Sequence, residues 1–250
     1  MSQTASWQES DSQDFIDYGR YFVPQREYQL QTIADLIPPP DGPAHILELS
    51  CGEGLLARVL LNRFPTITLH GYDISPAMLQ QAQARLAQFG PRFVPRQFDL
   101  AETEWRTAEP AFYAAVSSLT VHHLDGPDKL RLFLDLYRML QPGGVLVIAD
   151  LVASTRPLGT AVAAKAWDEA VRQRSQQLDG NDNALEQFER LKWNLYRYPE
   201  DPEFAVDKPS SLLDQLKWLE QAGFTAVDLH WALAGHVIYS AIRPSNSVSA

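Results

Sequence analysis

The stretch HILELSCGEG, residues 45–54, joins a short apolar run to a turn rich in small residues. Residues 46–49 predict a buried strand, and residues from about 55 to 63 predict a helix after the turn. Glu48 places a carboxylate inside that strand, where burial of an unpaired charge is costly or drives the group to its neutral form. An acid at this position therefore needs a functional explanation.

Apolar strands and amphipathic helices alternate after the turn. Further strands are predicted over residues 66–73, 92–99, 111–119 and 141–151, and helices over 76–90 and 125–140. Ser75 fits the N-cap of the first of these helices and Gly90 fits its end, while Pro95 places the strand 92–99 at a sheet edge. The alternation predicts a doubly wound α/β sheet with helices on both faces.

The two ends of the chain add helices and a hairpin. Residues 15–37 have helical apolar spacing and stop at PPPDGP (38–43), because proline disrupts a helix. Ser210 is predicted to cap a last helix that ends at Gly223, and residues 224–231 and 236–243 are predicted to form an antiparallel hairpin. The sheet should then have seven strands, mostly parallel with an antiparallel last strand. Residues 1–14 and 243–250 are expected to fray.

We expect one domain that carries an insertion. Its parts are an N-terminal helical segment (1–44), a cofactor-binding core (45–151), a helical lid insertion for substrate recognition (152–209), and a C-terminal helix and hairpin that complete the domain (210–250). A chain of 250 residues with 45% hydrophobic residues is long enough to bury such a core.

The amino-acid composition limits the classes of partner that the protein can have. The formal net charge of −10 counts against a nucleic-acid substrate, because phosphate binding depends on lysine and arginine. The single cysteine, Cys51, cannot form an internal disulfide, and no apolar run is long enough to span a bilayer. We therefore expect a cytoplasmic protein, a monomer or homodimer, that acts on a small molecule and has no nucleic-acid or membrane partner.

The predicted strand ends point to a nucleoside. Ligands of open α/β sheets bind at the carboxyl ends of the strands, where Asp73 suits a ribose diol and Asp99 suits an adenine amino group. Gly52, Gly54 and Ala57 also match the dinucleotide-binding spacing, so a nicotinamide cofactor stays possible at this point.

Glu48 favours a cationic ligand over a dinucleotide. A carboxylate beside the loop would repel a pyrophosphate, whereas it would attract the sulfonium of S-adenosylmethionine.

The chain here resembles the class I S-adenosylmethionine-dependent methyltransferases. The resemblance covers the loop acid and glycines and the stretches HGYDISPAML, QFDLAE, VHHLD, LQPGGVLVIAD and LEQAGF. It implies a Rossmann-like fold, S-adenosylmethionine as cofactor and S-adenosylhomocysteine as product. It also implies a cofactor site made of Glu48, Ser50, Gly52, Gly54, Asp73, Ile74, Asp99, Leu100 and Ser117. Ser50 replaces the first glycine of the family's loop, which puts the strength of cofactor binding in question.

His122 and His123 are the candidate catalytic bases, since both follow the strand 111–119 into the expected cleft. The alternative is that either histidine only bonds to the backbone. We expect no metal, because adjacent residues such as those of HHLD (122–125) seldom converge on one ion.

The insertion 152–209 is the predicted region of substrate recognition. Its candidate residues, with one from the N-terminal segment, are Tyr21, Trp167, Trp193, Tyr196 and Arg197. The alternative is that these aromatic side chains form a small core within the insertion.

The sequence therefore predicts a methyltransferase that acts on an O, N or C nucleophile of a small molecule. The alternatives are a non-catalytic S-adenosylmethionine-binding module, a nicotinamide-dependent oxidoreductase, and a tRNA or protein methyltransferase.

Overall fold

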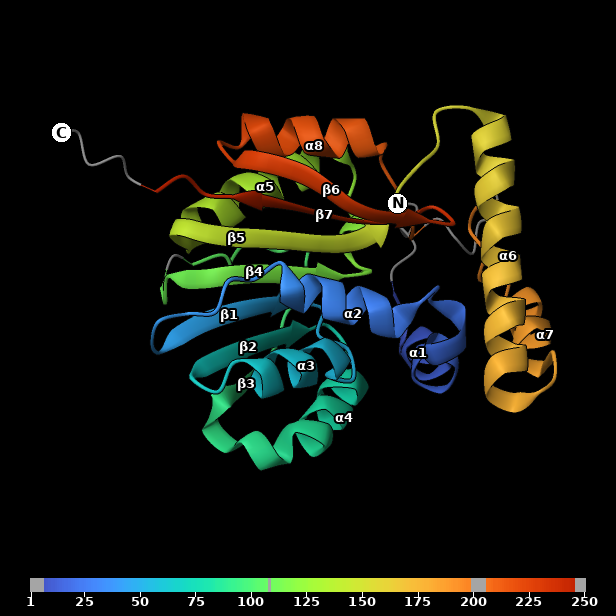
Figure 1. Ribbon diagram of the computed structural model, residues 1–250, viewed down its shortest axis with the longest axis horizontal. Helices are drawn as coiled ribbons and strands as arrows, with labels where there is room; N and C mark the ends of the chain where they lie inside the picture. The colour runs from blue at the N-terminus through green and yellow to red at the C-terminus, as the bar shows by residue number, and fades with distance from the viewer. Residues whose placement is uncertain (1–6, 108, 199–205, 246–250) are drawn as a thin grey trace, which may run out of the picture.

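A seven-stranded sheet forms the centre of the molecule in the computed structural model, which describes residues 7–107, 109–198 and 206–245 (Figure 1). The strands lie in the order β3-β2-β1-β4-β5-β7-β6. Their bounds are β1 Ala44–Leu49, β2 Ile67–Asp73, β3 Phe93–Gln97, β4 Phe112–Ser118, β5 Leu140–Leu151, β6 Thr225–Leu233 and β7 His236–Ile242.

The strand directions confirm the predicted sheet. The pairs β3–β2, β2–β1, β1–β4 and β4–β5 are parallel, whereas β7 runs antiparallel to both β5 and β6. Pro95 lies in β3 at the sheet edge, as predicted, because it has no N–H for a second ladder. The chain order reverses between β1 and β4, so the carboxyl ends of these strands are the place where an open α/β sheet binds ligands.

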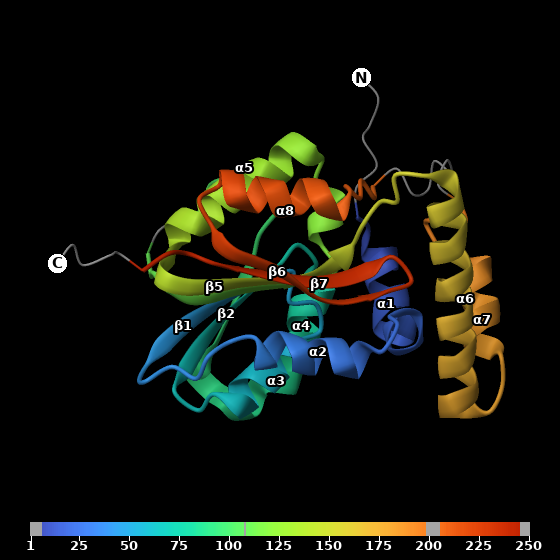
Figure 2. The same ribbon diagram turned by 45° about the horizontal axis from the view of Figure 1, so that its top comes forward.

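Helices cover both faces of the sheet (Figure 2). Side chains alternate along β1: Ile46 packs with α2 (Arg26–Asp35), α3 (Leu55–Arg63) and α4 (Pro76–Leu86), whereas Leu47 packs with α5 (Gly126–Met139) and α8 (Leu212–Gln221). The strands of a parallel sheet are apolar on both faces for this reason. The doubly wound arrangement is confirmed.

The N-terminal segment differs from the prediction. Helix α1 (Glu9–Phe22) already starts within the stretch expected to fray, and the expected single helical run breaks between α1 and α2. Pro24 and the left-handed backbone of Gln25 (φ 50°) account for the break. Residues 1–6 and 246–250, also expected to fray, lie outside the described part of the chain.

The helix caps follow local chemistry. Ser75 accepts from the Met78 N–H, so this predicted N-cap is confirmed, and Asp125 caps α5 in the same way by accepting from the Asp128 N–H. The last helix is capped by Ser211 and not by Ser210. Gly90 lies beyond α4 in the short 3-10 segment η1 (Ala87–Arg92), where its φ is 54°.

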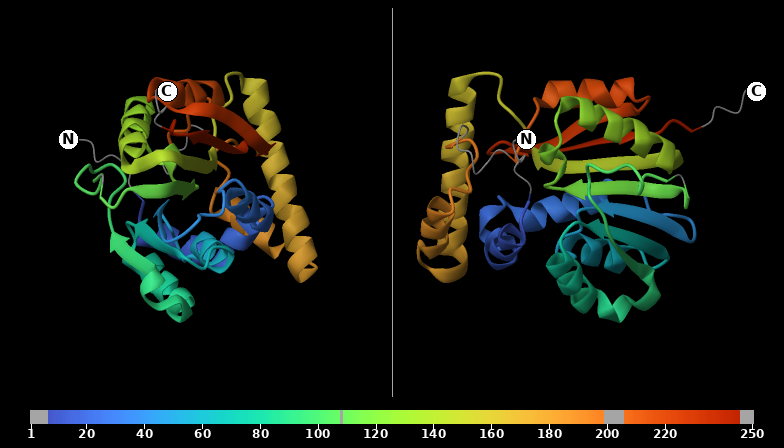
Figure 3. Two further views of the ribbon diagram at one scale, coloured as in Figure 1. Left: turned by 60° about the vertical axis from the view of Figure 1, so that its left-hand side comes forward. Right: turned by 180° about the vertical axis from the view of Figure 1, so that it is seen from behind.

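The insertion between β5 and α8 forms helices α6 (Pro157–Asp179) and α7 (Asn183–Arg190), which stand beside the sheet (Figures 1 and 3). Together with α1 they share a separate apolar cluster that includes Phe22, Trp167 and Phe188. We call α1, α6 and α7 the helical cap. In the described ranges, no helix combines the length and apolarity needed to cross a membrane, α6 included.

Candidate cofactor and acceptor site

A pocket of about 360 Å³ opens at the carboxyl ends of β1, β2 and β4. One group of lining residues comes from the strand ends and another from α1, the turn after β4 and the segment before α8. The described lining residues are Trp7, Phe15, Ser50, Gly52, Asp73, Ile74, Met78, Phe98, Asp99, Leu100, Ala101, Ser118, Leu119, Thr120, His123, Leu124, Val206 and Lys208.

The loop after β1 is held in left-handed backbone conformations. Ser50 has a φ of 51° and Gly52 a φ of 53°. The Ser50 hydroxyl lies 2.7 Å from the Thr120 hydroxyl, which ties this loop to the turn after β4. Gly54 (φ 80°) starts α3, where an added Cβ would lie 3.2 Å from Ala82. Serine therefore occupies a position that favours glycine, and its hydroxyl has a partner.

Glu48 lies inside β1 on the face that α2, α3 and α4 cover, and it is not among the pocket-lining residues. Its Oε2 atom makes no hydrogen bond within the described ranges. Burial, and secondarily the charge of Asp73, raises the pKa of Glu48 well above its usual value. Glu48 is therefore not the ionised, ligand-facing carboxylate expected from the sequence, because its buried environment favours the neutral carboxyl.

Asp73 and Asp99 both line the pocket, at the end of β2 and just beyond β3. Asp73 accepts from the Gly52 N–H at 2.8 Å and the Ser75 N–H at 2.9 Å, which fixes both carboxylate oxygens. Burial raises the pKa of Asp73, and these backbone bonds oppose that rise. Asp99 accepts from the Ala101 N–H at 2.9 Å.

Three other predicted cofactor residues lie at these strand ends. Ile74 and Leu100 line the pocket directly after Asp73 and Asp99. Ser117 is fully buried within β4, outside the lining, and its neighbour Ser118 lines the pocket instead. Alternation along β4 turns successive side chains to opposite faces, which accounts for the difference.

The two candidate bases have different surroundings. His122 is buried, with Nδ1 2.5 Å from Asp150 Oδ1 and Nε2 3.4 Å from Asp207 Oδ1. His123 lines the pocket, and its Nδ1 lies 3.1 Å from the same Asp207 oxygen. Both nitrogens of His122 thus face carboxylates, whereas His123 has one side toward the pocket.

The two histidines also differ in the direction in which their pKa is shifted. Burial disfavours the imidazolium of His122, but Asp150 and Asp207 outweigh this and raise its pKa to about 10. Burial, and then the His122 charge, lowers the pKa of His123. Burial also opposes ionisation of Asp207, but the two imidazoles outweigh it and lower the pKa of that carboxyl. His123 is the neutral histidine at neutral pH.

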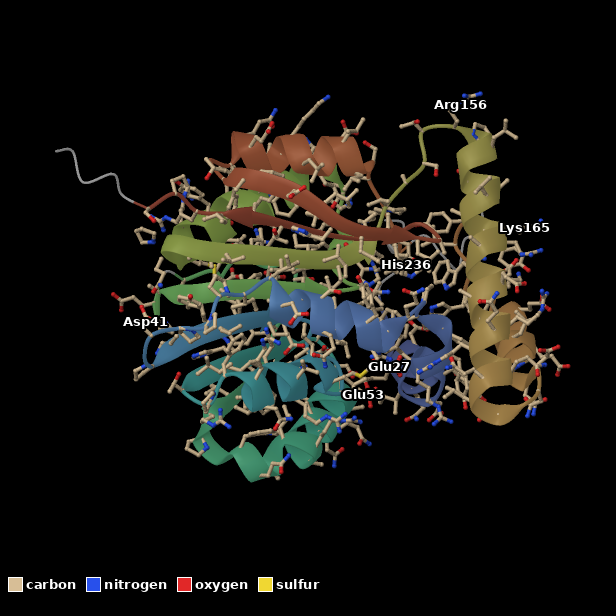
Figure 4. All side chains as sticks on the ribbon, in the orientation of Figure 1. Glu27, Asp41, Glu53, Arg156, Lys165 and His236 are labelled. Atoms are coloured by element: carbon tan, nitrogen blue, oxygen red, sulfur yellow. The ribbon has the colours of Figure 1, made fainter. Side chains whose placement is uncertain are left out.

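The five predicted substrate residues lie in or beside the core of the helical cap, outside the pocket lining. Trp167 donates its indole N–H to the Phe22 carbonyl at 2.6 Å, and its ring meets His236 edge-on at 4.6 Å between centroids. Figure 4 labels His236 where β7 approaches the cap. Tyr196 bonds to the backbone carbonyls of Val152 and Gly235, each at 2.9 Å.

The other three substrate candidates also have partners. The Tyr21 hydroxyl donates to Asp179 at 2.6 Å, and Arg197 forms an ion pair with Asp168. Trp193 packs against Phe15, 6.2 Å between ring centroids, and so supports a lining residue from behind. These contacts favour the alternative of a small core in the cap.

Sequence reasoning missed several residues of the site. Trp7 lies 5.6 Å from the His123 ring, between centroids, although it belongs to the stretch expected to fray. Lys208 and Asp207 come from the insertion's far end and meet the turn after β4, where the Lys208 N–H donates to the His122 carbonyl at 2.7 Å. These contacts join residues far apart in the chain, so no local motif could have indicated them.

Comparison with known proteins identifies the domain. Residues 46–144 match the family described as "Methyltransferase domain". A trans-aconitate 2-methyltransferase from Variovorax paradoxus is 32% identical over 157 residues, which are 61% of this chain and 57% of that protein. The chain thus spans little more than half of that relative's length.

Solved structures support the fold. An O-methyltransferase family protein from Burkholderia thailandensis superposes with a TM-score of 0.67 at 13% identity, covering 96% of this chain and 61% of that one. The structure titled "PigF with SAH" superposes with a TM-score of 0.59 at 13% identity, covering 94% and 59% respectively. At 13% identity these two structures confirm the predicted fold. The domain match over residues 46–144 agrees with the resemblance to the class I S-adenosylmethionine-dependent methyltransferases.

Proposed function

We propose that this chain, which carries a methyltransferase domain over residues 46–144, transfers the methyl group of S-adenosylmethionine to a small-molecule acceptor. The observation that carries the proposal is the pocket itself. Its lining combines the strand-end acids Asp73 and Asp99 with a second group, His123, Trp7 and Lys208, whose segments contact one another. A single pocket lined by both groups suits a cofactor and an acceptor side by side.

The residues present fit the cofactor. Asp73 would hold the ribose hydroxyls, because its fixed carboxylate faces the pocket. Asp99 and the Leu100 backbone would hold the adenine, beside the apolar face of Phe98. The left-handed Gly52 leaves the loop backbone open, since an added Cβ would meet only the Met78 sulfur, at 3.8 Å.

Bound S-adenosylmethionine supplies an electrophilic methyl group on a sulfonium. The protein's part is then to place an acceptor in line with that group and to exclude water. Trp7 and Phe15 of the N-terminal segment cover the pocket with apolar surface, and Leu119 and Leu124 add to it from the turn after β4. His123 is the histidine on the acceptor side, whereas His122 supports the turn from within.

A small acceptor fits the enclosure and the charge. The pocket volume of about 360 Å³ lies in the range of small-molecule sites, and the net charge of −10 opposes an RNA substrate. Lys208 lines the pocket with an exposed side chain, so small carboxylic acids are the first acceptors to test. The name of the Variovorax relative, a trans-aconitate methyltransferase, supports the same choice. A cytoplasmic location is part of this proposal.

The test is to incubate the full chain with S-adenosylmethionine and a panel of small carboxylic acids, phenols and amines, and to follow S-adenosylhomocysteine and methylated product together. We expect one acceptor class to give both products in equal amounts. His123→Ala should lower turnover and leave cofactor affinity unchanged. Cofactor binding without transfer to any acceptor would instead support the non-catalytic binding module.

A further inference from the structure

Three ligand atoms of different residues converge at the acceptor side of the pocket. Nitrogens of His122 and His123 and a carboxylate oxygen of Asp207 all lie within 4.8 Å of one another. The adjacent histidines do meet, with ring centroids 4.1 Å apart, contrary to the expectation that neighbours in HHLD would not share a centre. Two nitrogens and one oxygen make a ligand set that divalent transition metals prefer.

The distances to Asp207 are close to those expected for ligands that share one ion. His122 Nε2 and His123 Nδ1 lie 3.4 and 3.1 Å from the same oxygen of Asp207. Ligands bound at about 2.0–2.2 Å in a tetrahedral site lie roughly 3.3–3.6 Å from one another. His123 Nδ1 is buried, yet it forms no hydrogen bond of acceptable geometry with any described residue. The neutral tautomer with its proton on Nε2 leaves the Nδ1 lone pair for a metal.

His122 also has the partner that metal-binding histidines usually have. Its Nδ1 lies 2.5 Å from Asp150, a fully buried carboxylate on β5. Such a carboxylate fixes the ring orientation and strengthens the other nitrogen as a ligand. Asp150 thus leaves His122 Nε2 directed at the centre, and an ion that binds there would displace the proton of that nitrogen to water.

The two segments that carry the ligands are fixed to each other. The Lys208 N–H donates to the His122 carbonyl at 2.7 Å. The buried Lys129 ammonium donates to the carbonyls of Leu124 and Lys208, at 2.6 and 2.5 Å. Asp207 is therefore held beside the histidine turn by its neighbour's backbone, so that the ligand set is already assembled.

We propose that His122, His123 and Asp207 bind a divalent transition-metal ion, such as Zn²⁺, at the acceptor side of the pocket. Three protein ligands leave a coordination position free, and His123 borders the pocket into which it would open. An acceptor hydroxyl bound there would lose its proton to water, because the ion stabilises the resulting oxyanion. This catalytic role rests on the proposed function, whereas metal binding does not.

The test uses the chelator-treated full chain titrated with Co²⁺, whose visible absorption reports its ligands, followed by displacement with Zn²⁺. We expect one Co²⁺ per chain. His123→Ala and the isosteric Asp207→Asn should each weaken binding by at least about 100-fold, and Asp150→Asn by about 10- to 100-fold. Circular dichroism checks that each variant is folded.

A second histidine pair serves as the control. His45 Nδ1 lies 2.9 Å from His70 Nε2 in β1 and β2, away from the pocket lining. His45→Ala should leave Co²⁺ binding unchanged. Absence of saturable binding, or binding that survives Asp207→Asn, would overturn the metal site.

S-adenosylhomocysteine is titrated into the same samples. A protein that binds this ligand but no Co²⁺ would overturn the metal site alone. The opposite result would overturn the proposed function and leave the metal site standing.

Discussion

Ser50 combines a backbone cost with a side-chain bond. Its φ of 51° is a left-handed conformation that serine adopts at a cost, and its hydroxyl bonds to Thr120 at 2.7 Å. The bond also joins the β1 loop to the turn after β4, so both sides of the pocket depend on it. The departure from the family's glycine is thus compensated locally.

Variants of Ser50 should separate these two effects. Ser50→Ala removes the bond but keeps the cost, and should lower the free energy of unfolding by about 1 kcal/mol. Ser50→Gly removes both, and should be more stable than Ser50→Ala by about 1 kcal/mol. Urea unfolding of the three proteins measures this. Equal stability of the two variants would show that the left-handed backbone carries no penalty here.

Asp73 is the residue on which cofactor binding should depend most. Asp73→Asn removes a charged acceptor from the pocket and should weaken S-adenosylhomocysteine binding by about 10- to 100-fold, or ~1.5–3 kcal/mol. Calorimetric titration measures the loss. Asp41→Asn is the control, because Asp41 is exposed and lies at the far end of the sheet from the cap (Figure 4). Unchanged affinity in Asp73→Asn would remove this residue from the site.

Strand-end residues could be read from the sequence because position in a parallel sheet follows from local pattern. Asp73 and Asp99 were predicted in this way, whereas Ile74 and Leu100 came from the family resemblance, and all four line the pocket. Asp207 could not be found, because it reaches His123 only through the packing of a distant segment. Long-range contacts of this kind leave no local signal.

Lys129 of α5 is fully buried and connects this helix to the segment before α8 through hydrogen bonds. Its ammonium donates to the Leu124 and Lys208 carbonyls and to the Ser210 hydroxyl. Burial lowers the pKa of Lys129 to about 8, although Asp150 and Asp125 oppose the shift. A charged lysine in this place satisfies three acceptors and costs desolvation energy.

Deprotonation of Lys129 should therefore make the free energy of unfolding depend on pH in the alkaline range. Between the folded pKa and the higher unfolded pKa, the unfolded chain binds more protons, so the Lys129 contribution to the free energy of unfolding rises with pH. The free energy of unfolding of the native protein should therefore rise by about 2 kcal/mol relative to that of Lys129→Met from about pH 7.5 to about pH 9.5. Urea unfolding at both pH values measures it.

The exposed Lys165 of α6, labelled in Figure 4, is the matched control. Lys165→Met should show no such change with pH. A difference between the native protein and Lys129→Met that stays constant across this range would contradict the lowered pKa of Lys129.

Mutations in the helical cap should lower the stability of the protein and should not weaken ligand binding. Tyr196→Phe removes the hydroxyl that bonds to Val152 and Gly235, and should lower the free energy of unfolding by about 1–3 kcal/mol. Cofactor affinity and acceptor KM should stay unchanged. A raised acceptor KM at native stability would return Tyr196 to the substrate site.

The helices and strands were predicted better than the residues at which they begin and end. Alternating apolar runs determined the sheet and the helices on its two faces, because burial in a parallel sheet follows from pattern alone. The cap of α8 was placed one residue early, since Ser210 and Ser211 offer the same local chemistry and tertiary contacts choose between them. The start of α1 at Glu9 was missed because residues 8–14 are polar and have no apolar periodicity, although Gln8 and Asp11 form a capping box there.

At the scale of the whole molecule, the helical cap stands beside the sheet (Figure 3), and the pocket is lined by the strand ends together with α1 of the cap. The sheet supplies the strand-end acids, and the N-terminal segment closes the pocket with Trp7 and Phe15. The turn after β4 and the segment before α8 contribute the histidines and Asp207. Cofactor and acceptor functions thus come from different parts of the chain that only the complete fold brings together.

Calorimetric titration of the purified full chain with S-adenosylmethionine and S-adenosylhomocysteine, with NADH as control ligand, tests the central claim most directly. We predict that one molecule of either sulfur ligand binds per chain with micromolar affinity, and that NADH does not bind. Tight NADH binding, or no binding of either sulfur ligand, would contradict the assignment of this pocket to methyl transfer.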